Sequence, residues 1–183
     1  MGKEEALSKY MFNGNLSTCV CGKLYDISLW KTIRCPIGKL HEDQYTTYKL
    51  IDQSETVVFD PSPKYYYYKR PGSIGHSEFS AKHYDLYNAI QEQYNFVTEH
   101  YPAQGSVMSV AKITWELVFI NFMIQADQYD LPLIKKTRAF AKKHFHDVLR
   151  CNEINAVRKI QIALFAYLPS IYKITYLKYK KRN

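Results

Sequence analysis

The sequence predicts an α+β chain that is predominantly helical, with a few strands in a mixed first segment and helices after it. Two runs rich in β-branched and aromatic residues, TVVF (56–59) and KYYYYK (64–69), flank Asp60-Pro61-Ser62-Pro63, and such runs on either side of a proline turn are typical of two strands. Further along, apolar residues recur every three or four positions, as they do along one side of a helix. We therefore divide the chain into a mixed segment, 1–76, and a helical segment, 77–183.

The mixed segment opens with a short helix over residues 3–10, which Asn13-Gly14-Asn15 interrupts. The run 17–26, STCVCGKLYD, is expected to form a strand that leads into a short helix around Leu29 and Trp30. After Asp43, three residues at a spacing of three predict a helix that ends before Glu55: Tyr45, Tyr48 and Ile51.

The helical segment begins with one long stripe of six residues spaced by three or four: Tyr84, Tyr87, Ile90, Tyr94, Val97 and Tyr101. We expect this stripe to face the core or an interface. Further helices are expected over 107–127, 131–150, 154–167 and 169–180. The most apolar of them contains Lys112 and Glu116, so it falls short of the roughly 20 uninterrupted apolar residues that span a bilayer, and we expect a buried helix.

Composition narrows the class of protein. The 183 residues, 46% of them apolar and 23% charged, suit one globular domain with or without a small appendage rather than a disordered chain. The net charge of +8 favours an anionic partner, such as a phosphate, a nucleic acid or an acidic membrane surface. No signal peptide precedes the cysteines, which form no regular framework, so we expect a cytoplasmic protein with reduced thiols: Cys19, Cys21, Cys35 and Cys151.

Two adjacent carboxylates follow an imidazole in CPIGKLHEDQYTTYKL (35–50), where His41, Glu42 and Asp43 stand at the mouth of a predicted helix. A carboxylate at that position caps free backbone N–H groups and suits the positive end of the helix dipole, which is a purely structural role. The same position also holds a carboxylate fixed and exposed, as a general base requires.

A second polar cluster, KRPGSIGH (69–76), combines Arg70 with a Pro-Gly turn, Ser73 and His76. The planar guanidinium group is well shaped to bind a phosphate through two hydrogen bonds, and turn N–H groups and a hydroxyl add donors. The alternative is a strand end whose basic residues face water.

The order of these motifs, KLYD, then CPIGKLHEDQYTTYKL, then YYYYKRPGSI, resembles the second half of family 2 glycosyltransferases of the GT-A fold, over about residues 1–90. The similarity is strongest to bacterial enzymes that build cell-surface polysaccharides. It implies a partial GT-A fold in residues 1–76 and a helical extension in residues 77–183. It also implies transfer of a sugar, with inversion, from a nucleotide diphosphate sugar to a hydroxyl of a glycan acceptor.

The resemblance assigns roles to individual residues. Asp43 matches the family's general base, which takes the proton of the acceptor hydroxyl, while Glu42 and His41 lie on the acceptor side. Arg70 and Ser73 match residues that lie near the donor diphosphate.

The sequence departs from the family because the nucleotide-binding half and its Asp-x-Asp motif are missing, and Cys35 replaces an aromatic residue. The complete enzyme is expected to use Mg²⁺ or Mn²⁺, held mainly by residues that this chain lacks, so this chain alone is expected to hold no metal ion. His76 is a candidate for one further ligand in the complete enzyme. The chain would then work with a missing N-terminal half or as a homodimer, in the cytoplasm or at the inner face of the membrane.

The alternative function is a non-catalytic binding or assembly module, whose tyrosines and basic tail KYKKRN (178–183) bind a partner subunit, a glycan or, peripherally, a membrane. Nucleic acid is a less favoured partner, since only charge and aromatic content point to it.

Overall fold

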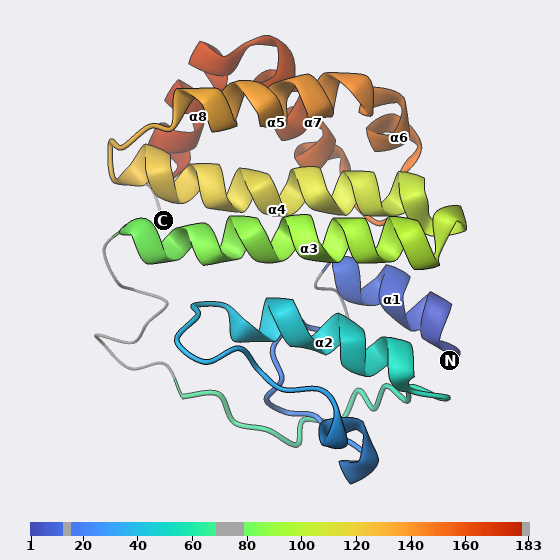
Figure 1. Ribbon diagram of the computed structural model, residues 1–183. Coiled ribbons are helices and arrows are strands. Elements are labelled where there is room, and N and C mark those ends of the chain that lie inside the picture. The colour runs from blue at the N-terminus through green and yellow to red at the C-terminus, as the bar shows by residue number, and fades with distance from the viewer. Residues whose placement is uncertain (13–15, 69–78, 181–183) are drawn as a thin grey trace. The chain divides into compact units, whose positions relative to one another are not determined.

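The computed structural model describes residues 1–12, 16–68 and 79–180, and the chain divides into two compact units, Met1–Gln93 and Tyr94–Asn183 (Figure 1). The division falls within one long helix, α3 (Tyr84–His100). The boundary expected after residue 76 lies outside the described residues.

The first unit is built around two helices, α1 (Lys3–Met11) and α2 (Glu42–Gln53), which pack against each other. Helix α1 buries Ala6, Leu7 and Tyr10, which lie on one side because they are three or four residues apart. The shorter elements are the 3-10 helices η1 (Ile27–Lys31) and η3 (Ala81–His83). The helices predicted over 3–10, around Leu29 and from Asp43 are therefore confirmed.

The predicted strands are wrong, because the part of the chain that the structure describes contains helices and no strand or sheet. The runs 17–26, 56–59 and the described part of 64–69 form no ladder. Residue 57 makes a strand-like contact, in which Val57 N–H donates to the Met1 carbonyl at 3.0 Å and the amino group of Met1 donates to the Val57 carbonyl at 2.8 Å. Strand propensity measures how well a residue fits into a sheet, and none of the described residues forms a partner strand for these runs. The α+β class and the partial GT-A fold are therefore corrected to an all-helical structure.

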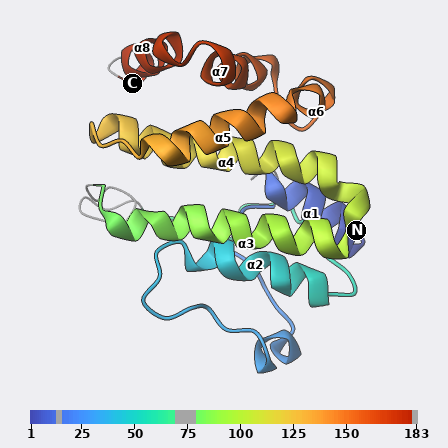
Figure 2. The ribbon, with the colours of Figure 1, turned by 45° about the horizontal axis from the view of Figure 1, so that its top comes forward.

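The second unit contains the C-terminal part of α3 and six further helices: η4 (Pro102–Gln104), α4 (Gly105–Gln125), α5 (Leu131–Lys143), α6 (Phe145–Arg150), α7 (Ala156–Tyr167) and α8 (Pro169–Lys180). Figure 2 shows these helices in layers, with α5 between α4 and the pair α7 and α8. The helix predicted over 131–150 is broken at His144, whose imidazole bonds to Asp147 at 2.9 Å.

Helix α4 forms the core of this unit, and twelve of its 21 residues are buried. The two charges that interrupt its apolar sequence form a buried pair, Lys112 with Glu116, and the Lys112 ammonium also lies over the Phe140 ring at 4.8 Å. Residues Pro102–Gln125 are long and apolar enough to cross a membrane, yet 67% of the apolar window is buried, as is usual for a core helix.

The stripe predicted along α3 is only partly buried. Ile90, Val97 and Tyr101 are buried, whereas Tyr84, Tyr87 and Tyr94 are half-buried. The remaining buried positions belong to neighbouring residues: Asp85, Leu86, Ala89 and Gln93. The hydroxyl of a tyrosine favours the edge of a core, where it can reach a polar partner. Several of the buried positions of α3 are therefore neighbours of the tyrosines in the predicted stripe.

Candidate functional site

The loop before α2 is fixed to the first turn of α3 by one carboxylate. Asp85 accepts a hydrogen bond from Lys39 Nζ at 2.7 Å and another from the Leu40 N–H at 3.1 Å. Burial alone would raise the pKa of Asp85, but these bonds outweigh it and hold that pKa below its ordinary value. The loop also needs positive φ at Gly38 (77°) and at His41 (59°), a conformation that glycine adopts freely and histidine rarely.

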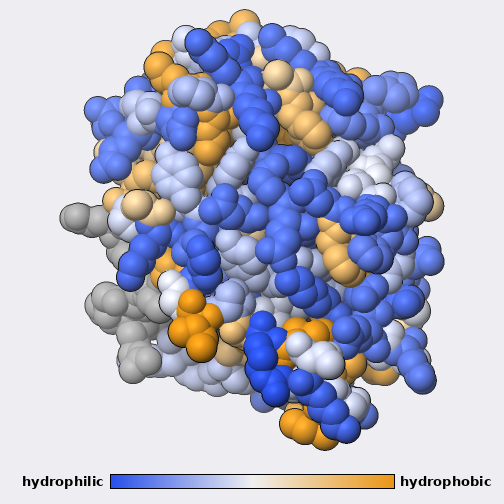
Figure 3. All heavy atoms as spheres, in the orientation of Figure 1, coloured by the Kyte–Doolittle hydropathy of each residue, from blue (hydrophilic) through white to orange (hydrophobic). Residues whose placement is uncertain are grey.

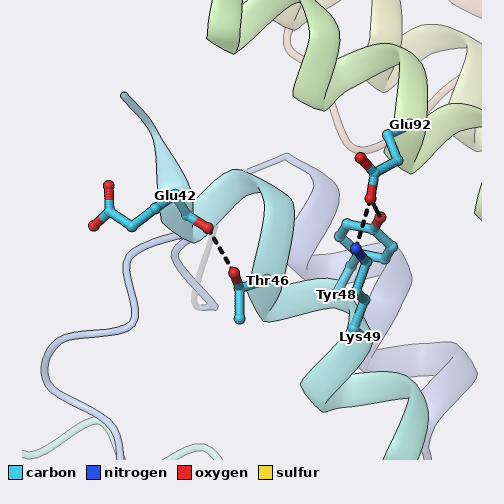
Figure 4. Close-up of polar contacts among 5 residues, drawn as sticks. All are labelled: Glu42, Thr46, Tyr48, Lys49 and Glu92. Atoms are coloured by element: carbon cyan, nitrogen blue, oxygen red, sulfur yellow. Dashed lines mark hydrogen bonds and ion pairs between the residues drawn. The ribbon is translucent and has the colours of Figure 1, made fainter. Parts of the chain in front are cut away.

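Helix α2 is held to α3 by further contacts along its length. Gln44 Nε2 donates to Gln93 Oε1 at 2.7 Å in a buried position. One turn later the Tyr48 hydroxyl donates to Glu92 at 2.9 Å, and Lys49 forms an ion pair with the same carboxylate at 2.6 Å (Figure 4). The start of α2 is therefore a fixed position in the first unit rather than a fraying helix end.

The two carboxylates of the motif differ in their surroundings. Glu42 is exposed, and Figure 4 shows its side chain directed away from α2, while its backbone carbonyl accepts from the Thr46 hydroxyl at 2.7 Å. Asp43 is half-buried, and one carboxylate oxygen accepts from the Gln44 N–H at 2.7 Å. Within the described ranges no other donor bonds to the Asp43 carboxylate, so its second oxygen is available to a ligand.

His41 is half-buried beside these carboxylates. Burial lowers the pKa of its imidazole, while the negative charge of Asp43 acts in the opposite direction and the nearby His83 adds to the lowering. The imidazole is therefore neutral at physiological pH, and it can both donate and accept a hydrogen bond.

The surroundings of Asp43 include residues that the sequence did not single out as site residues. Burial raises the pKa values of Cys19 and Tyr25 and lowers the pKa of Lys23, and the Asp43 charge makes a smaller contribution to each, so the loop 19–25 lies within reach of that charge. Lys23 donates to the Cys19 carbonyl and to Ser17 Oγ at 3.3 Å, and burial lowers the pKa of its amine. The Thr47 hydroxyl donates to the Thr18 carbonyl at 2.7 Å and ties this loop to α2. In the sequence, the motif KLYD (23–26) of the family resemblance was the one feature that pointed to the loop beside Asp43.

The extended segment 64–68 lies against the same loop. At Gly22, where φ is 69°, an added Cβ would come within 3.4 Å of Tyr65 Cβ, and the Cys21 thiol raises the pKa of the Tyr65 phenol. The four tyrosines of the segment nevertheless remain exposed: Tyr65, Tyr66, Tyr67 and Tyr68. Aromatic side chains are thus gathered next to the loop that borders Asp43.

The predicted diphosphate-binding residues, Arg70 and Ser73, lie outside the described residues, as does His76. Among the residues that the structure describes, no three His, Cys, Asp or Glu side chains converge as metal ligands do. The structure places His41, Glu42 and Asp43 at one helix start, and the Asp43 charge contributes to the pKa values of Lys23 and Tyr25.

Comparison of the chain with protein-family models, with curated proteins and with solved structures finds no match. The family resemblance therefore stays a prediction from the sequence motifs.

Proposed function

We propose that the first unit supplies the acceptor side of a sugar-transfer site in which Asp43 is the general base. The observation that carries this proposal is the half-buried Asp43 carboxylate, which stands on a fixed helix start and has one oxygen that no described residue occupies. A general base has to be held in place and yet be reachable by the group that it deprotonates. The motif order in the sequence supports the same role.

In the proposed reaction the acceptor hydroxyl donates a hydrogen bond to the open oxygen of Asp43. The hydroxyl oxygen bonds to the anomeric carbon of the donor sugar as its proton passes to Asp43. The bond from that carbon to the nucleoside diphosphate breaks on the opposite face, which inverts the configuration. Neutral His41 and exposed Glu42 bind other hydroxyls of the glycan, while Arg70 and Ser73 bind the departing diphosphate. In the complete enzyme a Mg²⁺ or Mn²⁺ ion would add positive charge at the diphosphate.

The test is Asp43→Asn in an enzyme completed by a nucleotide-binding half. The amide keeps the size of the side chain but cannot take a proton, so turnover should fall by about 10² to 10⁴. Glu55→Gln is the matched control, because Glu55 is an exposed carboxylate just beyond the other end of α2. Circular dichroism should show equal helix content in both variants, and wild-type turnover by Asp43→Asn would refute the assignment.

A second candidate function, a non-catalytic module that binds a partner, is favoured by the exposed tyrosines 65–68. Exposed aromatic residues are common anchors in binding surfaces. Under this alternative, Tyr66→Ser combined with Tyr68→Ser should abolish binding to a partner subunit or a glycan, whereas Asp43→Asn should leave that binding intact.

A further inference from the structure

Helix α7 has an apolar side that faces solvent. Val157 and Ile160 are 63% and 60% exposed, and Tyr167 lies on the same side. The opposite side of the helix is buried through Ile162, Phe165 and Ala166. An amphipathic helix in a soluble unit normally presents polar residues to water, so this helix is apolar on both sides.

Helix α8 continues the exposed apolar surface. Ile171 and Ile174 are 46% and 54% exposed, while Tyr172, on the other side, is buried and donates to Asn121 Oδ1 at 2.8 Å. The rings of Phe165 and Tyr172 meet at 5.4 Å, so the buried sides of the two helices face each other and the core. The exposed sides therefore both face outward. Figure 3 views the second unit from the side of α5 and shows hydrophobic residues scattered among hydrophilic surface there. We call these residues the α7–α8 face: Val157, Ile160, Tyr167, Leu168, Ile171 and Ile174.

The charge of the chain is concentrated in the same unit. Residues 94–183 contain 14 basic and 6 acidic residues, whereas residues 1–93 contain 11 of each. From residue 154 to the end there are seven basic residues and no acidic one. Lys178 and Lys180 are exposed, and neither of them forms an ion pair with another described residue. Lys173 is excluded from this group because it lies over the Tyr129 ring at 4.5 Å.

We propose that the α7–α8 face docks on the surface of an anionic lipid bilayer. Amphipathic helices with lysine and apolar residues lie in the interface, where the apolar side chains enter the acyl boundary and the lysines meet anionic headgroups. A second copy of the chain is a poorer occupant, because residues 154–183 carry seven basic residues and no acidic one, so the charges around two such faces would repel each other. Nucleic acid would match the charge but would leave the isoleucines exposed. This inference does not depend on the proposed sugar transfer.

The test is flotation of the full chain with vesicles of phosphatidylcholine mixed with phosphatidylglycerol, compared with vesicles of phosphatidylcholine alone. We expect binding to the mixed vesicles only. Ile160→Asp combined with Ile174→Asp should weaken that binding at least about tenfold, because both changes put a charge into the acyl boundary. Lys178→Gln combined with Lys180→Gln should weaken it roughly thirtyfold, since each basic residue near an anionic surface contributes about 1 kcal/mol.

The control also replaces two exposed apolar residues by aspartate, but in the first unit: Leu24→Asp combined with Ile37→Asp, both at fully exposed positions. This variant should bind like the wild type. Loss of binding in the control would overturn the assignment to the α7–α8 face, as would an absence of binding to mixed vesicles. Binding that depends on the lysines but not on the isoleucines would reduce the interaction to charge alone and would also overturn the proposal. Light scattering that shows a dimer disrupted by the isoleucine changes would identify a second copy as the occupant instead.

Discussion

Asp85 decides whether the loop before α2 holds its shape, because its carboxylate accepts from both Lys39 and the backbone of Leu40. Asp85→Asn keeps the shape but removes the charge, so we expect the free energy of unfolding to fall by about 1–2 kcal/mol at neutral pH. The pKa of Asp85 in the folded state is below its ordinary value of 3.8. Its stabilisation is therefore complete above 3.8 and is lost as the pH falls through the folded-state pKa.

Urea unfolding of the wild type and Asp85→Asn at decreasing pH measures this effect. The difference between the two proteins should shrink toward zero at the acid end of the series. Glu55→Gln, at an exposed carboxylate, should give no difference at any pH. A difference for Asp85→Asn that does not change with pH would argue that the carboxylate charge is not what fixes the loop.

Local signals in the sequence predicted the start of α2 but not the contacts that fix it. The Gly38 turn, the adjacent carboxylates and the apolar spacing after Asp43 are all short-range features, and they located the helix correctly. Asp85 lies 46 residues from Lys39, and Lys23 reaches the neighbourhood of Asp43 through a loop without regular structure. No spacing rule connects such residues, because tertiary packing alone brings them together.

At the scale of the element, α4 shows how a charged pair is accommodated in a core helix. Lys112 and Glu116 are 5% and 1% exposed and pair one turn apart, so removal of one partner leaves a buried charge. We expect Glu116→Leu to lower the free energy of unfolding by about 3–5 kcal/mol. Thermal unfolding followed by circular dichroism would measure the loss.

The matched control replaces both partners, Lys112→Met with Glu116→Leu. Neither side chain then carries a charge, so the double variant should be about as stable as the wild type or more stable. If the double variant is as unstable as Glu116→Leu, the ion pair stabilises the fold by more than the mutual neutralisation of two buried charges.

The elements predicted by periodicity were mostly found, and those predicted by residue type were not. Spacings of three and four residues located α2 and α3. Valine and tyrosine content predicted strands in 56–59 and 64–69, but a strand requires a partner strand, and within the described part of the chain Val57 pairs with Met1 alone. The break at His144 had no glycine or proline to indicate it, since α5 and α6 are separated by that single residue.

At the scale of the whole molecule, the two compact units differ in net charge. The first unit is neutral by residue count and carries the candidate acceptor residues, while the whole net charge of +8 resides in the second. Charge far from zero on one unit favours an anionic partner for that unit alone. Composition predicted an anionic partner for the chain, but the position of the charge became informative only with the unit boundary at residue 93.

The last prediction is that this chain by itself will not transfer sugar from a nucleotide sugar. Much of the rate of a transferase comes from holding both reactants in one geometry, and the sequence has no Asp-x-Asp motif to position a donor diphosphate through a metal ion. Donor hydrolysis and transfer should therefore stay at background with several nucleotide sugars in Mg²⁺ or Mn²⁺. Addition of a nucleotide-binding half should restore transfer with the wild type and not with Asp43→Asn. Metal-dependent transfer by the isolated chain would contradict the requirement for a second half, and restored transfer by Asp43→Asn would contradict its role as the base.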